Sequence, residues 1–253
     1  MAAITGGATA AEGVDLFIAA SVSVRIRPTG SKDPFALRRA ALGILDMLVS
    51  GARRIPLSPA LRVAGAKDPD DLIAFFADRL KVQQREAGVR HDLIDAVFAL
   101  GGEDDLVRLL ARVKALQAFV ETEDGKNLIA GYKRAANILK AEEKKDGVAH
   151  TLDLDALDSP YIGETEKNLA AQFARAEGAS GVLLFDEVDA LLAAEDFEGA
   201  MKRLSVLRAP VDRFFEDVTV NDPDPAVRKR RLGLLAGIRD AMHRVADFSK
   251  LEG

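Results

Sequence analysis

The chain has 253 residues, of which 48% are hydrophobic and 30% charged, a balance typical of folded domains that bury one or two cores. It contains no cysteine, which excludes disulfides, thiolate metal sites and a cysteine nucleophile, and its three histidines lie too far apart in sequence to predict a metal site. The net charge of -5 argues against a broadly basic nucleic-acid coat, so any RNA contact has to be local.

The sequence predicts neither a membrane span nor a secretory signal. Its longest apolar run, residues 16–24, is interrupted by serines and is about half of the roughly 20 residues that a spanning helix needs. The amino terminus lacks the positive charge and the apolar stretch of a signal peptide. We therefore expect a cytoplasmic protein that makes no membrane contact.

Composition favours helices over sheets. Only 6% of the residues are aromatic, tryptophan is absent, and alanine and leucine are frequent, so we expect an all-α fold. Residues 55–65 are rich in proline and glycine and resemble a linker. The expected organisation is a small helical segment over residues 1–66 and a larger helical bundle over residues 67–253.

Three helices are predicted directly after this boundary. Asp70 or Asp71 can cap the first, which ends at Gly88, and the second covers residues 91–100. The third begins behind an acidic cap at residues 103–105. Its apolar seam consists of Leu106, Leu109, Val113, Leu116 and Val120.

Residues 126–145 predict a further helix with two distinct faces. The inward face comprises Leu128, Tyr132, Ala135 and Leu139, and a neighbouring polar face comprises Lys133, Asn137, Lys140 and Lys144. We expect Tyr132, like Phe119, to lie in the core rather than to stack on a ligand. The polar face is the most usable basic stripe of the chain.

The last part of the chain predicts a loop followed by helices. Residues 147–161 are polar and contain a proline, which favours a loop, and an apolar stripe follows from Met201 to Val218. Pro210 should kink or divide the helix that carries this stripe. Asp224 is a suitable cap for the final helix, with Pro225 in its first turn. The buried stripe of that helix is predicted to be Leu234, Ile238, Met242 and Val245.

Several separated stretches resemble one protein family in the same order along the chain. They are residues 28–40 (PTGSKDPFALRRA), 76–80 (FADRL), 90–97 (RHDLIDAV), 132–139 (YKRAANIL), 207–218 (LRAPVDRFFEDV) and 244–248 (RVADF). They are similar to the carboxy-terminal part of the bacterial glycyl-tRNA synthetase beta subunit. Together these stretches cover most of the chain.

The resemblance implies a fold and a role. It makes residues 1–66 the end of a helical middle domain with a linker, and residues 67–253 an all-helical anticodon-binding domain like that of arginyl-tRNA synthetases. It implies binding of tRNA, tRNA-Gly in particular, with the ligase alpha subunit as partner. Because glycine is activated on that separate subunit, we expect no catalytic residue, metal or cofactor in this chain; ATP and Mg²⁺ are implied only for the whole ligase.

The expected tRNA contacts combine cations for phosphates with planar or amide groups for unstacked bases. One cluster is Lys133, Arg134, Asn137 and Lys140, and a second is Arg79, Lys81, Arg85 and Arg90. The alternative for the first cluster is an ordinary solvated face in which Arg134 pairs with a carboxylate. The densest basic run, residues 228–231, points in several directions on a helix, so part of it must be structural or merely exposed.

A second, local resemblance lies within about residues 159–194, which would form an insert. Residues 161–169 (YIGETEKNL) and 181–192 (GVLLFDEVDALL) look like the middle of an AAA-type ATPase with its Walker B strand. There, Asp186 would help hold Mg²⁺ through water and Glu187 would polarise the attacking water. An ATPase module is therefore an alternative function.

The sequence lacks the phosphate-binding loop that this chemistry requires. Its only Gly-Lys pair, at residues 125–126, is followed by Asn127, and Val120 stands where the first glycine should be. Without that loop, Asp186 and Glu187 would only repel a triphosphate, so we expect both to be inactive. The simpler interpretation makes the segment part of a helical core, with residues 181–192 helical; its core positions would be Leu169, Phe173, Ala176, Val182, Leu183, Phe185, Leu191 and Leu192. A helical scaffold without activity is the third hypothesis.

Overall fold

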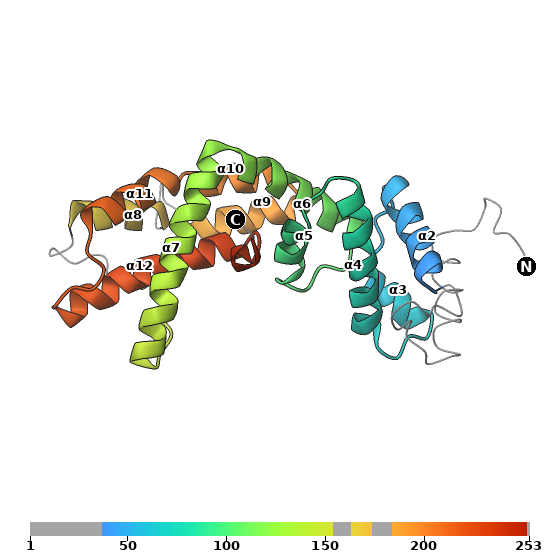
Figure 1. Cartoon of the computed structure of the whole chain (residues 1–253), viewed down its shortest axis with the longest axis horizontal. Helices are drawn as coiled ribbons and strands as arrows, with labels where there is room; N and C mark the ends of the chain where they lie inside the picture. Colours follow the sequence, from blue (N-terminus) through green and yellow to red (C-terminus); the bar gives the residue numbers. More distant parts are fainter. Residues whose placement is uncertain (1–36, 154–162, 174–183, 252–253) are drawn as a thin grey trace, which may run out of the picture. The chain divides into compact units, whose positions relative to one another are not determined.

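A computed structural model describes residues 37–153, 163–173 and 184–251, and every regular element in those ranges is helical (Figure 1). The expected all-α fold is thereby confirmed. The elements are α2 (Leu37–Ser50), α3 (Leu57–Val63), α4 (Pro69–Glu86), α5 (His91–Phe98), α6 (Leu106–Glu121), α7 (Glu123–Asp146), α8 (Glu164–Phe173), α9 (Leu184–Ala193), α10 (Phe197–Ser205), α11 (Arg208–Asp217), α12 (Pro225–His243) and the 3-10 helix η2 (Phe248–Lys250). None of these helices is long and apolar enough to cross a membrane.

The chain divides into two compact units. Unit 1 comprises residues 1–94 and 101–111, and unit 2 comprises residues 95–100 and 112–253. In unit 1, α2 and α3 both pack against α4. Helix α3 lies within residues 55–65, so the linker predicted there is largely a helix, and its Leu57 and Leu61 are buried. The domain boundary that the sequence predicts at residue 66 falls between α3 and α4, inside unit 1. It does not coincide with the division between the two units and stays a prediction.

Helix α4 begins slightly earlier than predicted. Its cap is Asp68, whose side chain accepts a hydrogen bond from the Asp71 amide (3.0 Å), and Pro69 occupies the first helical position. Asp70 and Asp71 therefore lie in the first turn, where their charge is favourable to the helix dipole. The helix ends before Gly88, whose φ of +85° is a conformation that favours glycine.

Helix α7 is the longest element described, with 24 residues and a length of about 36 Å. It starts three residues before the predicted position because Thr122 caps it, accepting a hydrogen bond from the Gly125 amide at 2.9 Å. The predicted inward residues, Leu128, Tyr132, Ala135 and Leu139, are all buried. The helix ends at Gly147, which has a φ of +72°.

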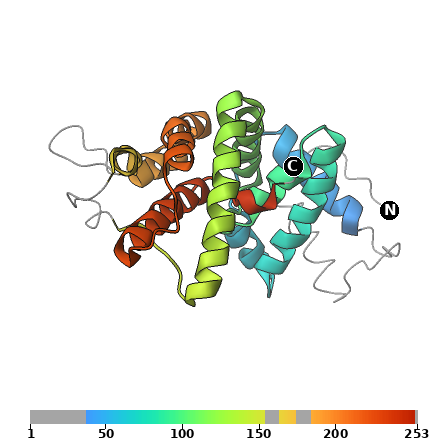
Figure 2. The same ribbon diagram turned by 60° about the vertical axis from the view of Figure 1, so that its left-hand side comes forward.

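Unit 2 is organised around α7, against which α10, α11, α12 and η2 all pack. Figure 2 shows α7 beside α12, drawn in red, from a second direction. Close approach of α11 requires a glycine at position 131, because a Cβ there would lie 2.6 Å from Cγ1 of Val211. The core of this unit therefore runs along the inner side of α7.

Helices α10 and α11 show how Pro210 acts on the predicted apolar stripe. The stripe is divided after Ser205, and Pro210 lies in the first turn of α11, where its missing amide removes no helical hydrogen bond. In α12, Asp224 is the cap and Pro225 the first residue, as predicted. The predicted stripe of Leu234, Ile238, Met242 and Val245 is fully buried.

The described part of the AAA-like segment is also helical and forms α8 and α9. Leu169, Phe173 and Leu192 are buried, whereas Phe185 and Leu191 are half-buried. The expectation of a helix over residues 181–192 is confirmed for residues 184–192. The other expected core positions, Ala176, Val182 and Leu183, lie outside the described residues.

Candidate functional site

The outer side of α7 carries the basic stripe predicted from the sequence. Arg134, Asn137, Lys140 and Lys144 are exposed, and their spacing of three or four residues places them on one side of the helix. Lys133, beside them, is half-buried. Asn137, Lys140 and Lys144 make no side-chain hydrogen bond or ion pair with other residues that the structure describes. We call Lys133, Arg134, Asn137, Lys140 and Lys144 the α7 face.

The alternative considered above pairs Arg134 with a carboxylate, and among the residues that the structure describes Arg134 makes no such ion pair. Its guanidinium carbon lies 4.3 Å from the centre of the Phe215 ring on α11, a cation–π contact, and the arginine remains exposed. The sequence reasoning missed Phe215, which is half-buried. A usable signal existed, since the predicted apolar stripe contains Phe214, and its neighbour Phe215 points in a different direction on the helix.

The acidic residues near the end of α7 are bound by arginines of α12. Asn221 donates a hydrogen bond to Glu142 at 3.2 Å, and Arg228 donates to both Glu142 and Asp146, the latter at 2.8 Å. Hydrogen bonds from Arg228, reinforced by Asn221, lower the pKa of Glu142, and Arg228 likewise lowers the pKa of Asp146. Arg228 therefore neutralises Glu142 and Asp146, and these two carboxylates do not pair with Lys140 or Lys144.

The dense basic run at residues 228–231 is largely structural. Arg231 donates hydrogen bonds at 2.8 Å each to Glu166 on α8, to Asp222 and to the Thr219 carbonyl. Arg228 is similarly occupied by acidic groups of α7, whereas Lys229 is exposed. The interpretation that part of this run is structural is therefore confirmed.

The second predicted cluster lies in unit 1 and is engaged with its own neighbours. The guanidinium of Arg79 lies 5.3 Å from the Phe75 ring centre, and Lys81 Nζ lies 3.9 Å from Asp78 Oδ1. Arg90 forms an ion pair with Asp92, and Arg85 is exposed in the last turn of α4. This cluster belongs to unit 1 and the α7 face to unit 2, so each is described within its own unit.

The Walker B-like carboxylates lie on a helix rather than at the end of a strand. Asp186 is exposed in the first turn of α9, and Glu187 forms an ion pair with Arg203 of α10. Asp189 pairs with Arg244 at 2.8 Å. Glu187 and Asp189 thus link α9 to other parts of unit 2. This is a structural role for two acidic residues of the AAA-like segment.

The Gly-Lys pair at residues 125–126 also has a structural explanation. Gly125 lies in the first turn of α7, and a Cβ at this position would overlap the backbone carbonyl of Phe119 at the α6–α7 corner. Lys126 Nζ lies 3.1 Å from Glu123 Oε1. The glycine is therefore required by a tight corner between two helices.

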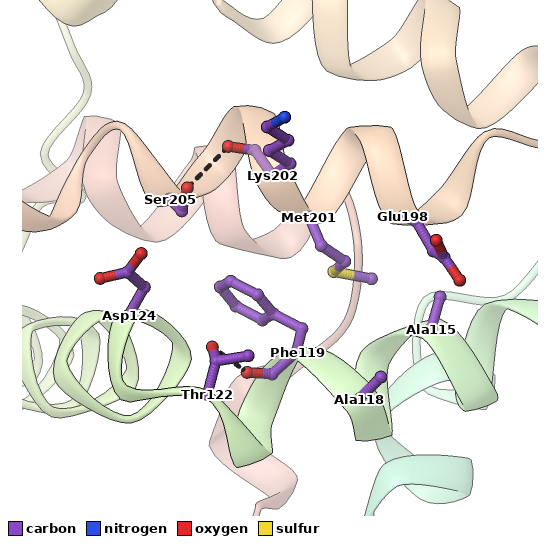
Figure 3. A pocket seen from close by; sticks show the side chains of 9 residues that line it. All are labelled: Ala115, Ala118, Phe119, Thr122, Asp124, Glu198, Met201, Lys202 and Ser205. Atoms are coloured by element: carbon purple, nitrogen blue, oxygen red, sulfur yellow. Dashed lines mark hydrogen bonds between the residues drawn. The ribbon is translucent and has the colours of Figure 1, made fainter.

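A shallow pocket of about 250 Å³ lies between this corner and α10. Figure 3 shows Phe119 and Met201 facing each other across it, with Asp124, Glu198 and Lys202 around the rim. Its lining offers neither a histidine nor a cysteine for catalysis. Among the described residues, no group of three or more histidine, cysteine or acidic side chains could hold a metal ion.

Tyr132 belongs to the core, as expected, and is only 2% exposed. Its hydroxyl lies 2.8 Å from Nε2 of His243, and its ring lies 5.7 Å from that of Phe248 in η2. Burial, followed by the nearby charge of Asp247, raises the pKa of Tyr132 to about 12. The phenol therefore stays protonated and holds the chain's end against α7. Phe119 is also buried, at 7% exposure.

Comparison with known sequences shows which proteins the chain is similar to. The family described as "Glycyl-tRNA synthetase beta subunit" matches residues 10–99. Glycine--tRNA ligase beta subunits from Rhodospirillum centenum, Phenylobacterium zucineum and a Ruegeria species are 52%, 50% and 46% identical to this chain, each across 90% of it. In sequence, the chain is a relative of the glycine–tRNA ligase beta subunit. It spans 31–32% of the length of these relatives.

The local resemblance to AAA proteins is found as well. The family described as "ATPase family associated with various cellular activities (AAA)" matches residues 129–226. The described residues of that range lie in α7 through α11, the start of α12 and their connections, and none of them is in a strand. The similarity is therefore one of sequence, in a region whose described secondary structure differs from the strand that a Walker B motif requires.

Proposed function

We propose that this chain is the tRNA-binding part of a glycine–tRNA ligase beta subunit, acting in the cytoplasm, and that it contacts the anticodon region of tRNA-Gly. In the whole ligase its partner is the alpha subunit, which supplies the glycine-activating site with ATP and Mg²⁺. The names of its relatives support the ligase, and the α7 face supports the RNA contact.

The observation that carries the RNA contact is the distribution of charge on α7. Lys140 and Lys144 are exposed, while the acidic residues of the same turns, Glu142 and Asp146, are bound by Arg228. Uncompensated lysines attract phosphates, and an exposed amide such as Asn137 can hydrogen-bond to the edge of an unpaired base. The α7 face thus offers both kinds of contact that a single-stranded loop requires.

Unit 1 contributes a second, weaker contact in this proposal. Arg85 is exposed, while Arg79, Lys81 and Arg90 are engaged with neighbouring side chains. Arg90 is held by Asp92, whose carboxylate is buried and would lose its partner if Arg90 turned to a phosphate, so the exposed Arg85 is the main phosphate contact of this cluster. This cluster is expected to add affinity without base selectivity.

Filter binding of a tRNA-Gly transcript at several salt concentrations tests the proposal. Affinity should fall as salt rises, because each phosphate contact releases counterions and contributes about -0.7 to -0.9 to the logarithmic slope. A second transcript that differs only in its anticodon should bind more weakly. Absence of binding at low salt would contradict the proposal.

The AAA family match makes an ATPase module the second candidate. It predicts magnesium-dependent phosphate release that disappears in the Glu187→Gln variant. We expect no such release, because Glu187 is held by Arg203 and the sequence contains no phosphate-binding loop. A scaffold without activity is the third candidate, and it predicts a cooperative thermal transition with affinity for neither tRNA nor ATP.

A further inference from the structure

The contact of Arg134 with Phe215 differs from the contacts of three other arginines of unit 2. Arg208, Arg228 and Arg244 each end on a carboxylate of another helix, and Arg244 also lies 5.5 Å from the ring centre of Phe185. Arg134 instead lies with its guanidinium carbon 4.3 Å from the ring centre of Phe215, and it remains exposed. No carboxylate of the described residues neutralises its positive charge, and the guanidinium lies over an aromatic ring.

The position of this pair is fixed by the packing of α11 along α7. Three contacts follow in the same order on both helices: Arg208 meets Asp124 at 3.0 Å, Val211 fits against Gly131, and Phe215 meets Arg134. Phe214, next to Phe215, is fully buried, and the two rings meet edge to face with their centres 5.6 Å apart. The Phe215 ring is thus held in place before any ligand arrives.

We infer that Arg134 and Phe215 form a stacking platform for one unpaired nucleobase of the bound RNA. This inference rests on the proposed function and names a site within it. A guanidinium is planar and weakly hydrated, and it stacks on aromatic faces as well as on bases. Every base offers a π face, so such a platform adds affinity without requiring one particular base.

The neighbouring residues of the α7 face extend this platform in a defined order. Asn137 follows Arg134 after one turn, about 4.5 Å further along the helix axis, and Lys140 follows Asn137 after the same interval. A base stacked on Arg134 therefore brings its edge toward the Asn137 amide and its phosphate toward Lys140. In this arrangement Arg134 stacks on the base, Asn137 contacts its edge, and Lys140 neutralises its phosphate.

The test combines changes in the full-length chain with changes in the RNA. Arg134→Lys keeps the charge but removes the planar group, and Phe215→Leu keeps apolar bulk but removes the ring. The RNA is a hairpin with the tRNA-Gly anticodon loop, in which one loop nucleotide at a time is made abasic. The matched control is Lys140→Ala, which removes a cation without touching the platform.

We expect one abasic position to weaken binding to the unaltered protein by about tenfold, and to have no further effect on the Arg134→Lys or Phe215→Leu variants. These two variants should keep the salt dependence of the unaltered protein. Lys140→Ala should lower the salt slope and remain sensitive to every abasic change that weakens the unaltered protein.

Two results would overturn the inference in distinguishable ways. If the unaltered protein binds the hairpin but each abasic change acts independently of both variants, the platform is wrong and tRNA binding stands. If the unaltered protein does not bind the hairpin or the whole transcript, the proposed function fails and the platform with it. Thermal unfolding identifies a misfolded Phe215→Leu variant, and Arg134→Lys, at an exposed position, then decides alone.

Discussion

The basic residues of α7 and those of α12 meet different surroundings. In α12, Arg228 and Arg231 point at carboxylates of α7, α8 and the segment before α12, so their charges are consumed by tertiary structure. In α7, Lys140 and Lys144 are exposed, and the nearby acidic residues are paired with α12: Glu142 and Asp146 with Arg228, and Glu143 with Arg239. The denser run of charge is thus largely structural, whereas Lys140 and Lys144 have no partner among the residues that the structure describes and are the better candidates for binding.

Reversing two charges on the α7 face should have the largest effect. In the Lys140→Glu/Lys144→Glu variant we expect the affinity for tRNA to fall by about 100-fold or more, since each charged contact contributes about 1.5–3 kcal/mol. The matched control is Lys114→Glu/Lys229→Glu, which makes the same change in net charge at exposed sites on α6 and α12. If filter binding shows that both variants lose tRNA affinity equally, the α7 lysines have no special role in binding.

Two buried glycines, Gly125 in α7 and Gly237 in α12, allow the packing of the two helices to be compared. Gly125→Ala in α7 should destabilise the fold by about 2–3 kcal/mol, because its Cβ would overlap the backbone carbonyl of Phe119, which cannot move aside easily. Gly237→Ala in α12 should change stability by less than about 1 kcal/mol. There the Cβ would meet side-chain atoms of Leu152 and Phe173 at 3.1 Å, and alanine favours the helix. Urea unfolding measures both, and the opposite ranking would contradict this account.

The Arg228→Ala variant should change how the stability of the fold depends on pH, because it removes the partner of two carboxylates of α7. Because Arg228 lowers the pKa of Glu142 and Asp146 below their ordinary values of 4.5 and 3.8, the pairing stabilises the fold above those values and is lost as the pH falls through the lowered ones. The variant should therefore be less stable at neutral pH, and the difference should shrink in acid. Thermal unfolding from neutral to acidic pH tests this, with exposed Lys229→Ala as control. A difference independent of pH would contradict the assignment.

The smallest effect is expected from Glu187→Gln in α9. Its pair with Arg203 is partly exposed, so the loss of stability should stay within about 1 kcal/mol. Phosphate release in the presence of ATP and Mg²⁺ should be absent before and after the substitution. Asp189→Asn, which breaks the neighbouring pair with Arg244, is the matched control. Release that requires Glu187 but not Asp189 would support the ATPase candidate instead.

Much of the helical framework could be predicted from local sequence. The caps and first residues of α12 and the inward stripe of α7 follow from patterns that span a few residues, and the structure confirms them. The start of α4 was misplaced because three aspartates, at positions 68, 70 and 71, are all plausible caps and only the chain's path selects Asp68. Arg134 and Phe215 lie on two helices that are far apart in the sequence. Helix periodicity relates only residues within one helix, so it could not predict their contact.

The sequence by itself determined most of the helices and their buried faces, because helix periodicity and capping act between residues within about four positions of each other. It did not indicate α3, which forms where a linker is predicted. Only the tertiary structure decided which charges remain available. Arg228 binds Glu142 and Asp146 across 86 and 82 positions of the chain, so these two carboxylates are occupied, while Lys140 and Lys144 are exposed. The partner of a charged side chain depends on how helices pack, and packing is set by the whole core rather than by neighbouring residues.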